Sequence, residues 1–183
     1  MIETGLNKFW HTPVYKTNVK FPDEMVNYLL TTYSADKNVS ANVSGGNLFE
    51  DTYLINYQEF IKPVFSVYAG MLGVDLQKKD YDLRAWLTGY GTGYAMPKHN
   101  HSGSHISAVF YLLVDEKGGD LILHDPRTNA NRGYKDELQS MFEPIRFSPK
   151  SGDIIMFPSY LYHSVESFNG KIRLAMPIDL ILY

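Results

Sequence analysis

Residues 105–114 read HISAVFYLLV, an almost uninterrupted apolar run that predicts a buried β-strand. From about Asp80 onward, such short runs alternate with Gly, Pro, Asn and Asp, which is the pattern of an all-β sandwich or barrel. The predicted strands are Leu83–Thr88, His105–Val114, Asp120–His124, Ile145–Ser148, Asp153–Phe157 and Ile172–Ile181. We therefore expect a mainly β fold over residues 80–183.

The residues before Asp80 have helical periodicity instead. Apolar side chains recur at helical spacing in Phe21–Lys37 and Tyr57–Leu72, while the polar stretch Asn38–Asn47 suits a loop. Pro63 stands near the start of the second helix or kinks it. No Pro- or Ser-rich linker follows, and two helices alone would have no core. We expect a single domain, residues 1–183, with a helical N-terminal support over 1–79 and a β core with the metal site over 80–183.

The composition narrows the function classes. The 183 residues include 17 basic and 20 acidic side chains, a net charge of -3, which disfavours a nucleic-acid partner. The absence of cysteine excludes disulfides, zinc-thiolate sites and cysteine nucleophiles, and leaves His, Asp and Glu as metal ligands. Neither a membrane-spanning apolar stretch nor a signal peptide is evident, so we expect a cytoplasmic protein that does not associate with membranes.

Three histidines have the spacing of a metal site. Side chains at i and i+2 of a strand project to the same side, so His99 and His101 could offer two imidazoles to one ion. His163 follows a predicted turn and buried strand, from which it could supply a third nitrogen. The alternatives are exposed loop histidines at 99 and 101 and a packed core histidine at 163.

Arg173 is a charged residue inside the apolar run Ile172–Ile181. A guanidinium buried there requires an anionic partner. That partner is either an acidic side chain of the same chain or a carboxylate ligand, which the planar fork of arginine binds through two hydrogen bonds.

The stretch from Ala85 to Ile178 resembles the 2-oxoglutarate- and Fe(II)-dependent oxygenases, specifically a group of small oxygenases of bacteria and tailed phages. Five ordered blocks carry the resemblance: Ala85-Trp86-Leu87, His99-Asn100-His101 with Ile106–Leu112, Asp125-Pro126-Arg127, Phe157–Val165, and Arg173. The resemblance implies a double-stranded β-helix (jelly-roll) core and a non-haem dioxygenase that uses Fe(II) and 2-oxoglutarate. Its expected activity is hydroxylation of an unidentified small-molecule or peptide substrate, and a homodimer is left open.

By the same resemblance, His99 and His163 bind iron, Arg173 binds the distal carboxylate of 2-oxoglutarate, and Tyr111 is a second contact. His101 stands where the superfamily usually has a carboxylate ligand, although members of the small group also have histidine there. A three-histidine site carries one negative charge less than a site with a carboxylate ligand. His105 and Asp125 are the other candidates to complete the site, Asp125 as a partner that orients an imidazole.

Two other readings remain. Gly93 and the His99–His101 pair match the first half of the cupin metal motif, and His105 stands where that motif has glutamate, although its second half matches poorly. A jelly roll could also be a non-catalytic binding or structural protein, which would not depend on Arg173.

Overall fold

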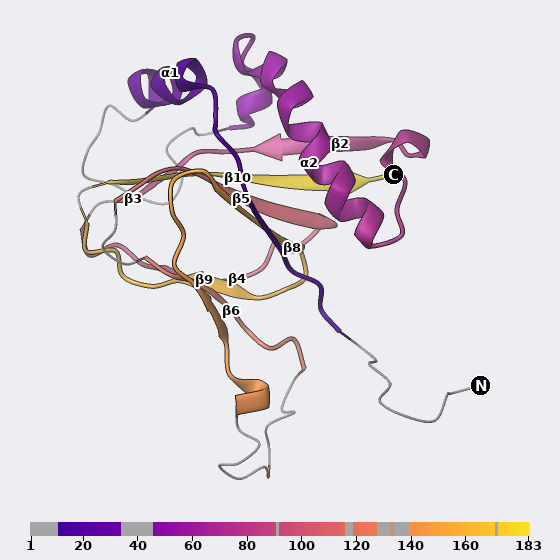
Figure 1. Ribbon diagram of the computed structural model, residues 1–183, viewed down its shortest axis with the longest axis vertical. Coiled ribbons are helices and arrows are strands. Elements are labelled where there is room, and N and C mark those ends of the chain that lie inside the picture. Colours follow the sequence, from indigo (N-terminus) through magenta and orange to yellow (C-terminus); the bar gives the residue numbers. More distant parts are fainter. Residues whose placement is uncertain are drawn as a thin grey trace.

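Two antiparallel β-sheets face each other in the computed structural model, which describes residues 11–33, 46–90, 92–115, 119–127, 133, 140–170 and 172–183 (Figure 1). The larger sheet runs in the order β1 (Tyr15–Asn18), β8 (Asp153–Pro158), β5 (Ile106–Val114), β10 (Arg173–Leu182), β2 (Tyr81–Ala85), with β3 (Thr88–Tyr90) also paired to β10. The smaller sheet runs β4 (Met96–His99), β9 (His163–Val165), β6 (Leu121–Leu123), β7 (Ile145–Phe147). This confirms the mainly β, jelly-roll fold.

Two helices cover the outer face of the larger sheet (Figure 1). They are α1 (Asp23–Tyr33) and α2 (Gln58–Met71), joined to the rest by 3-10 turns at Leu48–Glu50, Leu54–Tyr57 and Leu76–Lys78, with a further turn at Ser140–Phe142. Both predicted helices are confirmed, and Pro63 lies inside α2. Positions 34–37 of the first predicted helix and 38–45 of the predicted loop lie outside the described residues.

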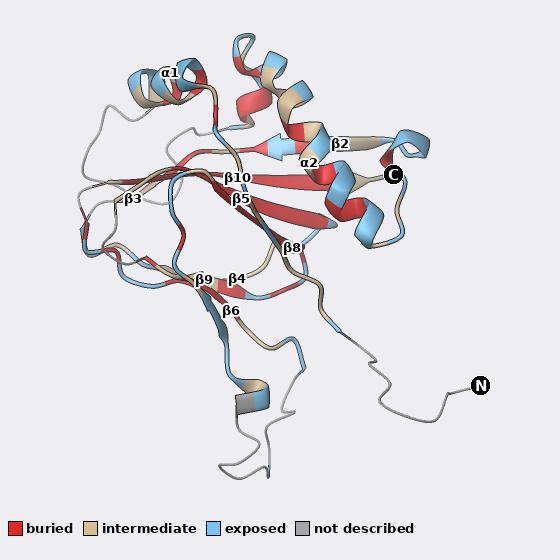
Figure 2. Ribbon diagram, in the orientation of Figure 1, coloured by how far each residue is buried: buried red, intermediate tan, exposed pale blue. Residues whose placement is uncertain are grey.

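The central strands are buried on both faces, as Figure 2 shows for β5 and β10. In β5, Phe110 belongs to the core between the helices and the larger sheet, the outer layer. Val109 and Tyr111 belong to the core between the two sheets, the inner layer. Because both faces need apolar side chains, the strand has the uninterrupted apolar run seen in the sequence.

Predicted Leu83–Thr88 is two strands, β2 and β3, and the reason lies in the neighbouring strand. The Trp86 N–H donates to the carbonyl oxygen of Pro177 at 3.1 Å. Proline has no N–H to return the second bond of this pair, so the ladder is interrupted there. The predicted strands matching β5, β6, β7, β8 and β10 agree with them to within one residue at either end, whereas β1, β4 and β9 were not predicted.

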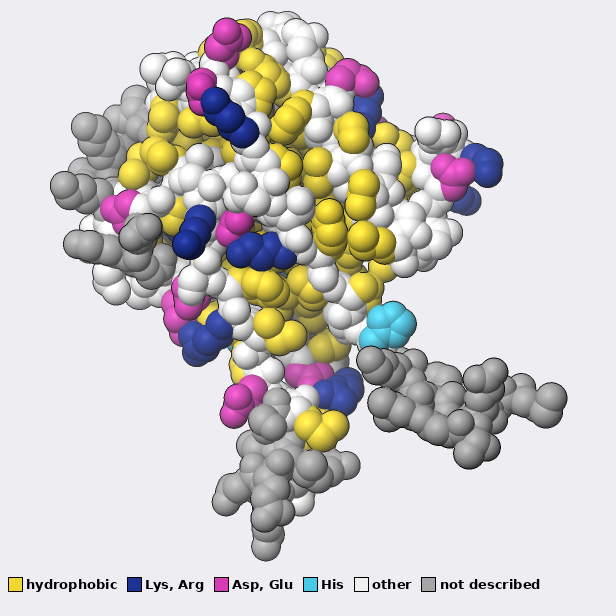
Figure 3. Space-filling view, in the orientation of Figure 1, with side chains coloured by type: hydrophobic (Ala, Val, Ile, Leu, Met, Phe, Trp, Pro, Cys, Tyr) yellow, Lys and Arg dark blue, Asp and Glu magenta, His cyan; other side chains and the backbone are white. Residues whose placement is uncertain are grey.

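Charged side chains of both signs are scattered over the surface drawn in Figure 3, interspersed with apolar ones. Among the residues that the structure describes, no helix is both long and apolar enough to cross a lipid bilayer.

Candidate metal centre

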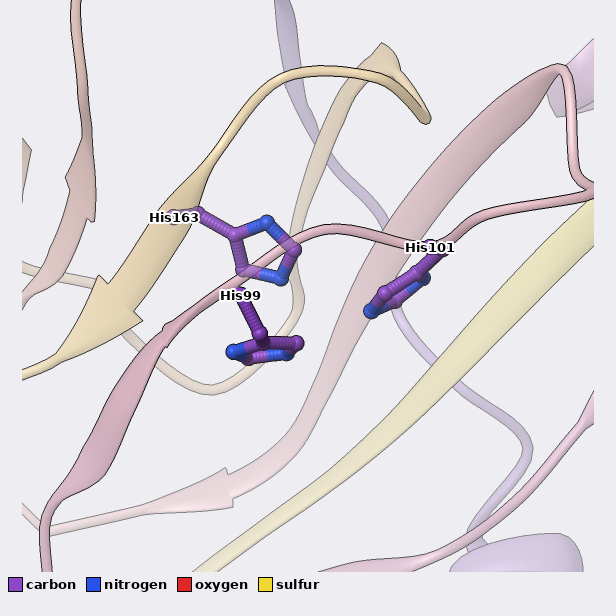
Figure 4. A group of neighbouring side chains, drawn as sticks. All are labelled: His99, His101 and His163. Atoms are coloured by element: carbon purple, nitrogen blue, oxygen red, sulfur yellow. The ribbon is translucent and has the colours of Figure 1, made fainter.

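The histidines at 99, 101 and 163 converge between the two sheets (Figure 4). His99 ends β4 and His163 begins β9, and the two are direct partners in the antiparallel register, with ring centroids 4.2 Å apart. The ligand atoms of all three residues lie within 4.8 Å of one another. The sequence prediction that these residues share a site is thus supported by their positions.

His101 reaches the group in a different way from the one that its spacing suggested. Strand β4 ends at His99, so His101 does not lie in the same strand as His99. It lies in the following loop, where its backbone N–H donates to the carbonyl oxygen of Ser159 at 3.1 Å and its carbonyl accepts from the N–H of Ser104 at 3.3 Å. The loop, not strand alternation, turns this imidazole toward the other two.

Hydrogen bonds fix the tautomers of the two strand histidines. Nδ1 of His99 lies 2.8 Å from the carbonyl oxygen of Pro97, and Nδ1 of His163 lies 3.1 Å from that of Leu161. A carbonyl oxygen only accepts, so each Nδ1 is the donor and carries the ring proton. The lone pair is then on Nε2, the atom that remains to bind a metal.

Burial keeps these imidazoles neutral. It lowers the pKa of His163, whose side chain is almost completely enclosed, to about 3, and it also lowers the pKa of His99. Removal of water disfavours the charged imidazolium in both cases. Neutral imidazole is the form that binds metal ions, so at neutral pH the two rings need lose no proton to do so.

Sequence reasoning missed an acidic residue beside His101. Asp179 lies in β10, is 7% exposed, and its Oδ1 accepts the Nδ1 proton of His101 at 2.8 Å. It stands six residues after Arg173 in the same apolar run, and even spacing places both on one face of the strand. That spacing, together with a second charge in a buried run, was the signal that could have identified it.

Arg173 begins β10 and is only 1% exposed. Its guanidinium carbon lies 5.1 Å from the centroid of the Tyr111 ring, which is also fully buried. Gly119 packs against the arginine stem: a Cβ there would come within 3.3 Å of both Arg173 Cδ and Phe168 Cδ2. The close approach of the backbone at Gly119 holds the long side chain in place.

One hollow joins these groups. Its volume is about 420 Å³, including the space open to solvent, and its walls include the three histidines, Tyr111 and Arg173. Three imidazoles suit Fe(II), and a buried guanidinium suits a carboxylate. The described residues therefore fit a metal ion and an anionic co-substrate held side by side.

The other two candidates lie elsewhere. Nδ1 of the exposed His105 accepts the backbone N–H of Leu182 at 3.1 Å, at the opposite end of β10 from Arg173. The carboxylate of Asp125 binds Arg127, with 2.6 Å between Oδ2 and Nη2, in a local turn. Asp179, not Asp125, is the carboxylate hydrogen-bonded to an imidazole.

Comparison with solved structures supports the fold assignment. A Pseudomonas putida prolyl-4-hydroxylase is 16% identical, with 92% of this chain and 91% of that chain covered and a TM-score of 0.53. A viral collagen prolyl hydroxylase from Paramecium Bursaria Chlorella virus-1, solved as a 2-oxoglutarate complex, is 11% identical over 91% and 94%, with a TM-score of 0.59. A Trichoplax adhaerens prolyl hydroxylase, bound to a hypoxia inducible factor peptide fragment, is 13% identical over 92% and 83%, with a TM-score of 0.61.

No curated protein matches the chain. The family model described as "Putative 2OG-Fe(II) oxygenase" matches residues 84–179, which include the three histidines, Tyr111, Arg173 and Asp179. That match favours the oxygenase reading over the cupin and the non-catalytic jelly roll. The chain therefore belongs to the 2-oxoglutarate- and Fe(II)-dependent oxygenases, enzymes that use ferrous iron and 2-oxoglutarate.

Proposed function

We propose that this protein is a hydroxylase whose iron is held by the Nε2 atoms of His99, His101 and His163. The observation that carries the proposal is the shared orientation of the rings. Each Nδ1 lies within hydrogen-bond distance of an oxygen acceptor, so the Nε2 atoms remain as the ligand atoms at one hollow. Bound Fe(II) and 2-oxoglutarate together would supply the oxidation by O₂ of a substrate C–H bond to C–OH, with release of succinate and CO₂.

Arg173 would bind the distal carboxylate of 2-oxoglutarate, and Tyr111 would be a second contact. The guanidinium lies in the same hollow as the histidines and is shielded from water, where a charged hydrogen bond to a carboxylate is stronger than at the surface. Held against Gly119 and the Tyr111 ring, the side chain needs little reorganisation to bind.

Burial of the site would limit access of water to the reacting atoms. His163, Tyr111 and Arg173 are each less than 5% exposed. The substrate is a small molecule or a peptide side chain; the peptide complex of the Trichoplax adhaerens enzyme makes a peptide a reasonable first class to screen.

The direct test is succinate formation from 2-oxoglutarate with Fe(II) and O₂. We expect His163→Ala to lower the rate at least about 100-fold, because one of three ligands is lost. His124→Ala is the matched control. The His124 ring is hydrogen-bonded to Ser164 and does not line the hollow, so this variant should form succinate at the wild-type rate. Equal background rates in wild type and His163→Ala would reject the iron site.

Co-substrate binding is tested separately, by calorimetry of 2-oxoglutarate with the Mn(II)-loaded protein. Arg173→Ala should weaken binding by about 100-fold and Arg173→Lys by about 10-fold, because lysine keeps the charge but not the planar fork. Unchanged affinity in Arg173→Ala would instead favour a metal protein that does not use 2-oxoglutarate.

A further inference from the structure

A site of three imidazoles has no negative charge among its ligands, unlike one with two histidines and a carboxylate. In this protein a carboxylate lies one hydrogen bond behind the ligand set. Oδ1 of Asp179 is 2.8 Å from Nδ1 of His101, on the side of the ring away from Nε2.

We propose that Asp179 is the positioning residue of the metal centre. Its carboxylate accepts the Nδ1 proton of His101 and directs Nε2 toward the metal. It also places a negative charge behind the histidine that stands where the superfamily usually has a carboxylate ligand. The inference rests on the proposed function, since it takes His101 to be a ligand.

The hydrogen bonds around Asp179 fix the direction of each proton. Ser107 donates to Oδ1 at 2.6 Å and Ser104 donates to Oδ2 at 3.0 Å. Because Ser107 has one proton and gives it to Asp179, Ser159 is the donor in the 2.8 Å contact between the two serine hydroxyls. The carboxylate therefore accepts three bonds, including that of His101.

The three imidazoles differ in what accepts their Nδ1 protons. For His99 and His163 the acceptor is a neutral backbone carbonyl two residues earlier in the chain. For His101 it is the charged side chain of Asp179, from a strand of the larger sheet, with Ser107 Oγ as a longer contact of Nδ1 at 3.1 Å. Among the described residues, Asp179 is the only acidic side chain hydrogen-bonded to any of the three rings.

His101 also has the greatest need of external support, because its loop has no strand partner. Asp179 holds this loop at two points, the His101 ring and the Ser104 hydroxyl. The indole of Trp86 lies against the same ring, with centroids 5.3 Å apart. Removal of the carboxylate should therefore affect both the orientation and the electron donation of this one ligand.

The test is titration of the metal-free protein with Co(II), followed by visible absorption. Asp179→Asn keeps an acceptor oxygen but removes the charge, and we expect Co(II) affinity to fall by about 10- to 100-fold. Asp153→Asn is the matched control. Asp153 is 5% exposed, similarly buried, but binds Asn18 and Lys16 away from the hollow, so Co(II) affinity should be retained.

The variants separate this proposal from the proposed function. If Asp179→Asn binds Co(II) as tightly as wild type while His163→Ala does not, the role of Asp179 is overturned and the metal site stands. If His163→Ala also binds like wild type, the metal site itself is rejected.

A second measurement needs no substitution at Asp179 and applies even where Asp179→Asn does not fold. Wild-type protein labelled with ¹⁵N-histidine and loaded with Zn(II) should show the Nδ1–H tautomer for all three ligands by nuclear magnetic resonance. The ring proton of His101 should resonate furthest downfield, since its acceptor is charged. A proton on Nε2 of His101 would overturn the proposal.

Discussion

The outer and inner layers are built on opposite faces of the same strands, yet their chemistry differs. On the face toward the helices, β5 and β10 contribute only apolar side chains. On the face toward the smaller sheet, the same two strands contribute Ser107, Tyr111, Arg173 and Asp179 in addition to apolar residues. Both faces are buried, so the burial of a residue does not by itself show whether that residue contributes to folding stability or to the functional site.

The difference indicates that the two faces of each strand have different roles. The helices and the outer layer supply a continuous apolar core, which is the main source of favourable free energy in folding. The inner layer contains charged and polar groups that are costly to bury and need fixed partners. Substitutions on neighbouring residues of one strand should therefore have effects of different kinds.

The largest expected effect is on the outer layer. Phe110 is fully buried and packs on Phe21, with ring centroids 5.8 Å apart. Phe110→Ala should lower the free energy of unfolding in urea by about 3–5 kcal/mol, because it leaves a cavity. Co(II) affinity of the protein that remains folded should not change.

Tyr111→Phe is the inner-layer counterpart, one residue along. It removes a hydroxyl and keeps the ring, so the free energy of unfolding should change by about 1 kcal/mol or less. Affinity for 2-oxoglutarate in the Mn(II)-loaded protein should fall. The comparison breaks down if Phe110→Ala weakens Co(II) binding or if Tyr111→Phe leaves 2-oxoglutarate affinity intact.

The next effect is a pH dependence of the free energy of unfolding, which arises from His163 in the inner layer. Burial lowers the pKa of His163 from 6.5 to about 3, so between these values the unfolded chain binds a proton that the folded chain does not. The resulting stability is complete above about pH 6.5 and falls as the pH decreases. From pH 7 to pH 5 the metal-free protein should lose about 2 kcal/mol through this residue.

Urea unfolding of wild type and His163→Gln at both pH values isolates this contribution. The difference in unfolding free energy between the two proteins should be smaller at pH 5 than at pH 7. A constant difference would show that His163 does not titrate as its burial requires.

The last comparison is between two glycines with positive φ. Gly119 has φ of 77° and touches the Arg173 stem. Gly73 has φ of 79° and lies just after α2, where a Cβ would meet no atom within 4 Å. Substitution by alanine at either should cost about 1–2 kcal/mol of stability through the backbone. Only Gly119→Ala should also weaken 2-oxoglutarate binding, measured by calorimetry, because it displaces Arg173.

The sequence predicted the long central strands well, because their apolar runs are local signals. It did not predict β4 and β9, which are short and gain their identity from pairing with each other. The break between β2 and β3 depends on Pro177, a residue in the neighbouring strand, so no pattern in residues 83–88 could reveal it.

At the site, the histidine triplet and Arg173 could be identified from residue type, spacing and resemblance. Asp179 could not be assigned its partner, because its contacts with His101, Ser104 and Ser107 span more than 70 residues of sequence. Long-range partners of this kind follow from strand register. Register was not available from the sequence alone.

The cross-strand pairing of His99 with His163 has a consequence for how the smaller sheet opens. A slip of one residue would turn one imidazole to the opposite face. An ion bound to both histidines therefore stabilises the native register of β4 on β9 by its binding free energy. Strand β4 is the edge of that sheet. The backbone amides of Met96, Lys98 and His99 should therefore exchange hydrogen with deuterium more slowly when metal is bound, and loss of iron should first be seen as faster exchange at this edge.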